Sequence, residues 1–209
     1  MPAERHGWPG RPSPLLRLPP WTRSARSCAP VSLMPSIDDA SVAVALGANQ
    51  PSAAGSPRET LVAVRPLLED LLKSWSAQEL VFRWSSLHDT APVGGPPDQP
   101  RYCNAVMLVE GLQAPPSVAA ALELLDALQG LEQQFGRNRS QEQRWGPRSL
   151  DLDLLFWGEL RLEHPRLLLP HPRLHLRTFV LEPLLQAMQG SAPPRSPDQP
   201  EPAAPGRDC

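Results

Sequence analysis

Residues 150–156 read Leu-Asp-Leu-Asp-Leu-Leu-Phe, and this alternation constrains the fold more strongly than any other stretch. Successive side chains of a β-strand point to opposite faces, so Asp151 and Asp153 share one face while Leu150, Leu152 and Leu154 share the other. The pattern predicts a strand with its leucines in a core. Its two carboxylates have two interpretations. Most often such residues form the solvated face of a half-buried strand, but Mg²⁺ is also commonly held by one or two carboxylates together with substrate phosphates.

The segment before this strand is rich in arginine, with Arg137, Arg139, Arg144 and Arg148. The chain has a net charge of −2, which gives no general attraction to nucleic acid or to anionic membranes, so any anion site must be local. Lys73 is the only lysine, which excludes a P-loop. The planar guanidinium group of arginine can bind two phosphate oxygens at once. A solvated charge run is the alternative, but Glu142 is the only nearby carboxylate, and this favours a phosphate site.

The order of the periodic segments predicts the fold class. Strands are expected at residues 41–46, 79–88, 102–110 and 150–156, and helices at 56–72 and 117–135. This β-α-β-β-α-β order is typical of a ferredoxin-like α+β sandwich, here with an additional C-terminal strand near 166–169 and a helix at 177–186. Both main helices should cover one face of the sheet. The opposite face would then be free for a site.

Proline marks the ends of the expected domain. Of 28 prolines, eight lie in residues 1–36 and six in residues 190–209, where no apolar period supports a core. We therefore expect disordered tails at 1–36 and 190–209 around one domain at 37–189. The arginine-rich first tail is either a transit peptide or, as we favour, a dispensable extension or an early start before Met34. Three scattered cysteines indicate a reducing cytosol, and hence a cytoplasmic protein.

Four blocks of sequence carry a resemblance to a known family. They lie at residues 45–49 (Ala-Leu-Gly-Ala-Asn), 102–106 (Tyr-Cys-Asn-Ala-Val), 144–153 (Arg-Trp-Gly-Pro-Arg-Ser-Leu-Asp-Leu-Asp) and 169–173 (Leu-Pro-His-Pro-Arg). In this order the chain, from about Val42 to Pro183, closely resembles the bacterial 6-hydroxymethyl-7,8-dihydropterin pyrophosphokinases of folate biosynthesis. The resemblance implies transfer of a pyrophosphoryl group from ATP to the primary alcohol of a reduced pterin, with release of AMP. Most of the acceleration of such transfers comes from alignment and charge neutralisation.

The resemblance also implies a role for individual residues. Asp151 and Asp153 would hold two Mg²⁺ ions, and Arg137 and Arg148 would act in catalysis on a loop that closes over the nucleotide. The implied pterin-binding residues are Thr90, Val93, Tyr102, Asn104, Trp145 and Phe179. The implied ATP-binding residues are Gln129, Glu132, Arg139, Arg144, Arg166, His171 and Arg177. Taken singly, Phe179 is more often a core residue, and Gln129 and Glu132 more often form a polar helix face.

The expected partners are ATP and the hydroxymethyl-dihydropterin, with no nucleic acid and no membrane. We expect a monomer that can associate with other folate enzymes. Two other functions remain open. An RNA-binding module of the same topology would need exposed sheet aromatics and a basic face, which residues 102–107 do not supply. A catalytically silent relative would bind pterin or nucleotide without transferring phosphate.

Overall fold

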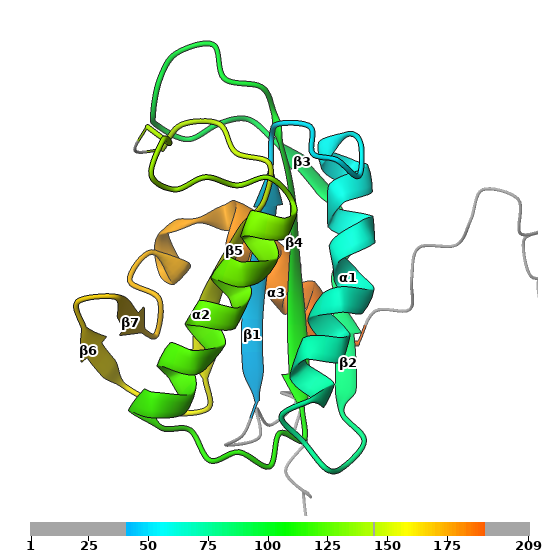
Figure 1. The fold of residues 1–209 in the computed structure, drawn as a ribbon, viewed down its shortest axis with the longest axis vertical. Coiled ribbons are helices and arrows are strands. Elements are labelled where there is room, and N and C mark those ends of the chain that lie inside the picture. The colour runs from blue at the N-terminus through cyan, green and yellow to red at the C-terminus, as the bar shows by residue number, and fades with distance from the viewer. Residues whose placement is uncertain (1–40, 144, 191–209) are drawn as a thin grey trace, which may run out of the picture. The chain divides into compact units, whose positions relative to one another are not determined.

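The computed structural model describes residues 41–143 and 145–190. A five-stranded sheet has the order β2-β4-β1-β5, β3 also pairs with β4, and all these pairs are antiparallel. The strands are β1 (Val42–Ala48), β2 (Val81–Trp84), β3 (His88–Thr90), β4 (Tyr102–Glu110) and β5 (Asp151–Trp157). The helices are α1 (Pro57–Lys73), α2 (Val118–Gln134) and α3 (Thr178–Met188), and β6 (Leu162–His164) pairs with β7 (Leu167–Leu169). Figure 1 shows α1 and α2 side by side on one face of the sheet and α3 behind it. The α+β class with its ferredoxin-like order is confirmed.

Both main helices begin and end where local chemistry predicts. At the start of α1, Ser56 Oγ accepts the backbone N–H of Glu59, and the Glu59 carboxylate accepts the N–H of Ser56 at 2.7 Å. This reciprocal capping box satisfies two backbone donors that the first helical turn leaves without partners. Ser117 caps α2 in a similar way, accepting the N–H of Ala120, and Gly136 follows its C-terminus with a φ of +84°. Few residues other than glycine adopt that backbone angle without strain.

The two faces of β5 differ in burial, as the alternation of leucine and aspartate predicts. Leu150, Leu152 and Leu154 are almost fully buried in the main core, together with residues of α1, α2, β1 and β4. Asp151 and Asp153 are only partly buried and lie on the other face. The strand therefore anchors two carboxylates with leucines that contribute to the core.

That other face is not free, contrary to our expectation. A second apolar cluster covers part of it, in which Val180, Leu184 and Ala187 of α3 pack on Ala43, Val106, Leu108 and Leu155. The C-terminal helix was predicted, but its apolar side has to be buried somewhere, and the sheet face opposite α1 and α2 provides the surface. Only the end of the face that carries Asp151 and Asp153 is left for a site.

Smaller differences concern the strands. The strand expected at 79–88 is interrupted between β2 and β3, because Ser85 Oγ accepts the N–H of Val106 and Gln186 of α3 accepts the N–H of Ser86, each at 2.9 Å. The strand expected near 166–169 is β7, but its partner β6 was missed. The tails expected at 1–36 and 190–209 lie outside the described residues, apart from Gly190. No helix of the described part has the length and apolar character needed to span a membrane.

Candidate active site

A cavity of about 510 Å³ opens at the end of the sheet face that α3 leaves uncovered. Its lining includes both aspartates of β5 and all six residues implied in pterin binding, namely Thr90, Val93, Tyr102, Asn104, Trp145 and Phe179. Its charged lining consists of Arg137, Arg139, Arg148, Arg173 and Arg177 beside the aspartates, and His171 also lines it. The fold thus gathers aromatic, amide, cationic and anionic groups from segments far apart in the sequence.

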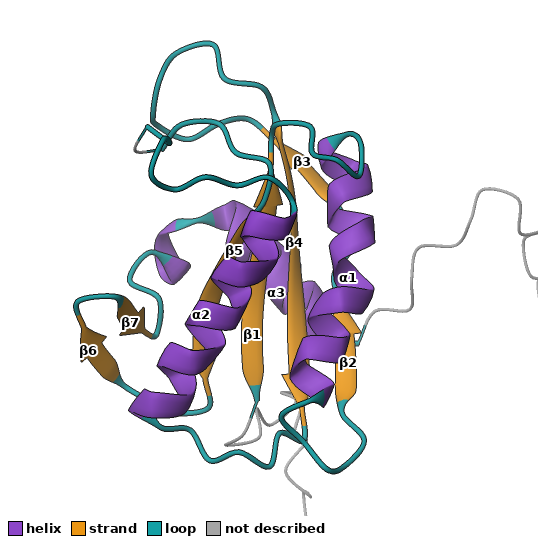
Figure 2. Ribbon diagram, in the orientation of Figure 1, coloured by secondary structure: helices purple, strands orange, loops and turns teal. Residues whose placement is uncertain are grey.

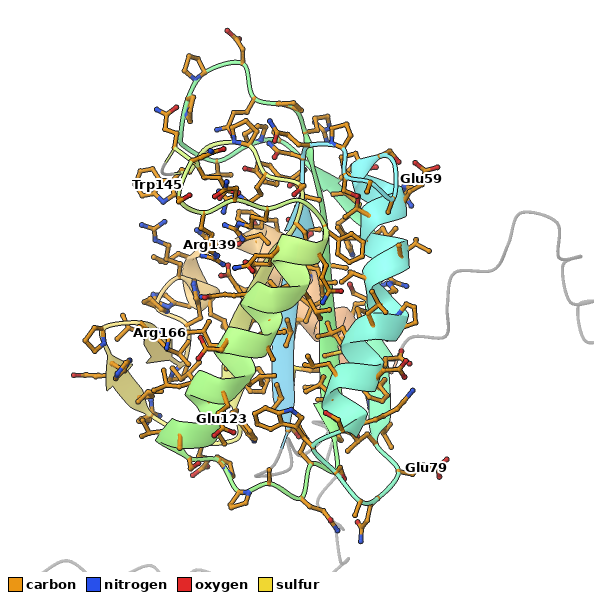
Figure 3. All side chains as sticks on the ribbon, viewed as in Figure 1. Glu59, Glu79, Glu123, Arg139, Trp145 and Arg166 are labelled. Carbon is orange, nitrogen blue, oxygen red and sulfur yellow. The ribbon has the colours of Figure 1, made fainter. Side chains whose placement is uncertain are left out.

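A second cavity of about 560 Å³ adjoins the first. Residues of α2, β5 and the β6–β7 hairpin line it, including Gln129 and Arg166. Arg139, Asp153, His171 and Pro172 line both cavities. In Figure 3, Trp145, Arg139 and Arg166 succeed one another down the left side of the view, from the arginine-rich loop toward the hairpin. Two ligands bound in these cavities would meet beside Asp153.

Arg137 is the centre of the charged cluster and only 7% of it is exposed. Its Nη1 donates to Asp151 Oδ1, to Glu132 Oε1 at 2.7 Å and to the Leu150 carbonyl at 3.2 Å. Its Nε donates to Glu142 at 3.1 Å. The three carboxylates around it raise its pKa despite burial, so the group stays cationic. A guanidinium held from several sides is fixed before any ligand arrives.

Glu132, implied in ATP binding, lies beneath this cluster of charges. Only 1% of it is exposed, and it lines neither cavity. Its carboxylate accepts hydrogen bonds from Arg137, from Arg139 at 2.9 Å and from the backbone N–H of Leu152 at 2.8 Å. Burial acts most strongly on its pKa, which is raised, while Arg137 opposes the shift. Glu132 therefore positions two arginines against β5, whereas Gln129, one turn earlier, faces the second cavity.

The two aspartates differ in electrostatic environment. Burial would raise the pKa of Asp151, but Arg137 and Arg148 outweigh it and lower the pKa; Arg148 Nη1 donates to Asp151 Oδ2 at 2.7 Å. The neighbouring Asp151 and then burial raise the pKa of Asp153 to about 7. No donor among the described residues forms a hydrogen bond with the Asp153 carboxylate. A bound cation is the kind of group that would stabilise the ionised form of Asp153.

The donor set fits Mg²⁺. The described residues contain no group of three or more His, Cys, Asp or Glu side chains arranged to bind a metal by themselves. Mg²⁺ does not require one, because it retains waters and is usually held by one or two carboxylates plus substrate phosphates. Each carboxylate oxygen carries two lone pairs, so the arginine contacts of Asp151 leave room for further coordination.

The residues implied in pterin binding all line the first cavity. Asn104 is buried, and its Nδ2 donates to Thr90 Oγ1 at 2.8 Å, which leaves its carbonyl oxygen turned toward Gly47. The Tyr102 hydroxyl donates to the Gly146 carbonyl at 3.3 Å. Trp145 has a φ of +61°, which is uncommon for a large residue, and the Arg173 guanidinium lies 5.0 Å from its ring centroid. Such unusual backbone is often found at functional sites.

The remaining candidates surround the junction of the cavities. The backbone N–H of His171 donates to the Leu155 carbonyl at 2.7 Å, and burial, Arg177 and Arg173 lower its pKa, which favours the neutral ring. Arg177 lines the first cavity, and its guanidinium lies 5.4 Å from the centroid of the Phe179 ring. Arg166 is paired with Asp126 at the surface of the second cavity. Arg144 lies outside the described residues.

Three residues near the site were not predicted from the sequence. Arg173 contacts Trp145, Glu142 contacts Arg137, and Asn49 bonds to the loops on both sides of the first cavity. Asn49 gave a usable signal, because it is a polar residue directly after a buried strand and ends the first of the four blocks. Arg173 likewise ends the fourth block, whereas Glu142 gave no signal, since its contact with Arg137 depends on loop geometry.

The chain is similar in sequence to a known protein family and to several of its members. The model of the 7,8-dihydro-6-hydroxymethylpterin-pyrophosphokinase family matches residues 43–189. A 2-amino-4-hydroxy-6-hydroxymethyldihydropteridine pyrophosphokinase of Pseudomonas aeruginosa is 42% identical over 143 residues, 68% of this chain and 77% of the relative. One of Synechocystis is 45% identical over 102 residues, 49% of this chain and 48% of the relative. A mitochondrial folate synthesis bifunctional protein of Arabidopsis thaliana is 44% identical over 112 residues, 54% of this chain and 18% of that protein.

Proposed function

The chain belongs to the 7,8-dihydro-6-hydroxymethylpterin-pyrophosphokinase family and is a diphosphokinase, and we propose that it transfers pyrophosphate from ATP to 6-hydroxymethyl-7,8-dihydropterin. The hydroxymethyl oxygen attacks the β-phosphorus of ATP and loses its proton. The bond from that phosphorus to the oxygen bridging to the α-phosphate breaks, and AMP leaves with the electron pair. The observation that carries the proposal is that two cavities with different linings meet at Asp153.

Asp151 and Asp153 would hold two Mg²⁺ ions at this junction. Bound there, Mg²⁺ would neutralise charge on the phosphate oxygens and align them for in-line displacement. The support is that the Asp153 carboxylate accepts no hydrogen bond from the described residues, whereas the neighbouring Asp151 already accepts hydrogen bonds from Arg137 and Arg148. Because leucines on the opposite face of β5 are buried, the two carboxylates are presented by a rigid strand rather than by a loop.

Arg137 and Arg148 act on the transferring phosphates. Each guanidinium group has five N–H donors, and the contacts to Asp151, Glu132 and Glu142 leave other N–H groups for phosphate oxygens. Donors already in place where charge develops lower the barrier without having to reorganise during the reaction. In this proposal, Arg139 and Arg144 add positive charge as the loop at 137–148 closes over the nucleotide.

The two cavities bind the two substrates. The flat pterin stacks on Trp145 and Phe179 in the first cavity, where Asn104 meets the amide edge of the ring and Tyr102, Thr90 and Val93 complete the wall. The nucleotide extends into the second cavity along Gln129 and Arg166, with His171 and Arg177 near its phosphates. Glu132 contributes by holding Arg137 and Arg139 rather than by touching ATP.

The proposal is tested by product analysis. Protein, ATP, Mg²⁺ and the hydroxymethyl-dihydropterin are incubated together, and nucleotides are separated by chromatography. We expect AMP to accumulate in step with pyrophosphorylated pterin, no AMP without the pterin, and no product when a chelator removes Mg²⁺. Formation of ADP instead, or AMP formation that does not need the pterin, would contradict the assignment.

The proposal further places the enzyme in the cytoplasm as a monomer that can associate with other enzymes of folate synthesis. The association with other enzymes is supported by the relative from Arabidopsis thaliana, a bifunctional protein of folate synthesis. Light scattering of the purified full chain tests the monomer. A dimer mass at micromolar concentration would exclude it.

A further inference from the structure

Arg173 is an arginine of the first cavity to which the proposed function gives no role. Its guanidinium lies over the Trp145 ring, 5.0 Å from the ring centroid. Within the described part of the chain, its side chain forms no ion pair and donates no hydrogen bond, although its backbone N–H donates to His171 Nδ1. A guanidinium that is held by its face keeps the N–H donors at its edge available. Arg173 is therefore held in place while its donors remain unused.

The other arginines of this cavity differ from Arg173 in their partners. The cavity is lined by five arginines, of which three are ion-paired with carboxylates, namely Arg137, Arg139 and Arg148. The fourth, Arg177, lies close to Asp153, and this carboxylate opposes the lowering of the Arg177 pKa by burial. Arg173 thus brings to the cavity a positive charge that no carboxylate of the described residues neutralises by an ion pair.

The neighbours of Arg173 add to this excess of positive charge. Burial lowers the pKa of both His171 and Arg177, and the charge of Arg173 lowers both further. In Figure 2 the short helix Leu174–Leu176, which directly follows Arg173, lies below the loop that carries Trp145. An anion bound between these two segments would relieve the repulsion among the basic groups.

The position of Arg173 indicates which anion this is. Arg173 lines the first cavity, which is assigned to the pterin, and does not line the second, which is assigned to the nucleotide. In the proposed reaction the pterin enters without phosphate and carries the negatively charged pyrophosphoryl group after the transfer. We infer that Arg173 binds the pyrophosphoryl group of the pterin product and contributes little to the binding of AMP.

The chemistry of the side chain suits this ligand. A guanidinium can donate two parallel hydrogen bonds to one phosphate group, and such charge-assisted bonds are stronger than neutral ones. Contact with the Trp145 ring orients the group before the ligand arrives, so less side-chain freedom is lost on binding. The product should therefore bind more tightly than the pterin itself, and part of this difference should depend on Arg173.

The experiment measures three dissociation constants by calorimetry in the presence of Mg²⁺, for the pterin, its pyrophosphorylated product and AMP. The proteins are the unmodified full chain, Arg173→Met, Arg173→Lys and the control Arg161→Met. Methionine keeps a long, unbranched side chain that can pack on Trp145 but has no donor. Arg161 is exposed and lines neither cavity, so the control removes the same charge elsewhere. Circular dichroism checks folding, and Arg173→Lys carries the test if Arg173→Met fails to fold.

The result is expressed as the dissociation constant of the pterin divided by that of the product. In Arg173→Met this ratio should fall by about 10-fold to 100-fold, the effect of losing a hydrogen bond to a charged group. In Arg173→Lys it should fall less, because the charge remains. The ratio in Arg161→Met and the affinity of the Arg173 variants for AMP should equal those of the unmodified chain.

Three results would overturn the inference: a full ratio in folded Arg173 variants, an equal fall in Arg161→Met, or an equal loss of affinity for AMP. The inference rests on the proposed function, and the AMP assay separates the two. Unmodified enzyme that makes AMP, together with a full ratio in Arg173→Met, refutes only the role of Arg173. An unmodified chain that makes no AMP from ATP and the pterin refutes both.

Discussion

The two faces of β5 lie on one short strand and yet differ in almost every physical respect. On one face Leu150, Leu152 and Leu154 are 0–2% exposed within the main core. On the other face Asp151 and Asp153 stand beside arginines, and the pKa of Asp153 is raised because its neighbour is also an acid. The leucine face stabilises the fold, whereas on the acidic face Asp151 is paired with two arginines and the ionised form of Asp153 is disfavoured.

The largest expected effect comes from removing Asp153. Asp153→Ala should lower kcat by at least about 10³-fold, because metal ligation stabilises the transition state by several kcal/mol. Stability should be unchanged or slightly higher, since the substitution removes the repulsion between the two carboxylates. Steady-state AMP formation measures kcat, and thermal unfolding of the same preparation measures stability. Retained turnover, or a large loss of stability, would contradict the view that the acidic face of β5 serves activity and the leucine face serves stability.

Glu132 contacts residues of both faces of β5, so Glu132→Ala is expected to lower both stability and turnover. The variant removes one of the three carboxylates around Arg137 and leaves the buried N–H of Leu152 without its acceptor, which should cost about 1–3 kcal/mol of unfolding free energy. Turnover of the folded fraction should also fall, because Arg137 and Arg139 lose their support. Urea unfolding measures the free energy of unfolding, and single-turnover kinetics measure the turnover of the folded fraction. A stability loss with normal turnover would show that the arginines are positioned without Glu132.

Leu150→Ala is the counterpart of Asp153→Ala on the apolar face. The side chain is 0% exposed and lines neither cavity, and its truncation should destabilise the fold by about 2–5 kcal/mol through lost burial and a residual cavity. Activity per folded molecule should stay within a few-fold of the unmodified enzyme. Chemical denaturation gives the stability, and active-site titration corrects the rate. A loss of turnover larger than the loss of folded protein would contradict the comparison.

Arg148→Lys tests the guanidinium rather than the charge. Lysine keeps the positive charge near Asp151 but cannot donate in the planar, bidentate manner of arginine. The loss of one charge-assisted hydrogen bond should lower kcat/KM by roughly ten- to a hundredfold. The melting temperature should change little. Unchanged kcat/KM would show that only the charge at this position matters.

The smallest expected effect is at the rim of the second cavity, where Asp126 pairs with Arg166 in solvent. Asp126→Asn should leave the melting temperature unchanged, as exposed ion pairs contribute little. It should also release Arg166 and lower KM for ATP by no more than about fivefold. Steady-state kinetics in low salt measure the change. A rise in KM for ATP would argue against nucleotide binding by Arg166.

The sequence predicted what depends on local pattern. The leucine and aspartate faces of β5 and the extents of α1 and α2, expected at 56–72 and 117–135, follow from short-range rules, and the structure confirms them. The placement of α3 on the sheet was missed, because an amphipathic helix does not specify which surface buries it. The bridging contacts of Asn49 and the burial of Glu132 were missed for the same reason, since both depend on loops meeting across the fold.

A crystal structure of the full chain with Mg²⁺, a non-hydrolysable ATP analogue and the pterin tests the central claim most directly. Our account predicts Mg²⁺ within about 2.0–2.1 Å of carboxylate oxygens of both Asp151 and Asp153. The polyphosphate should lie at the junction of the two cavities and the pterin between Trp145 and Phe179. Metal ions and phosphates located away from both aspartates would contradict it.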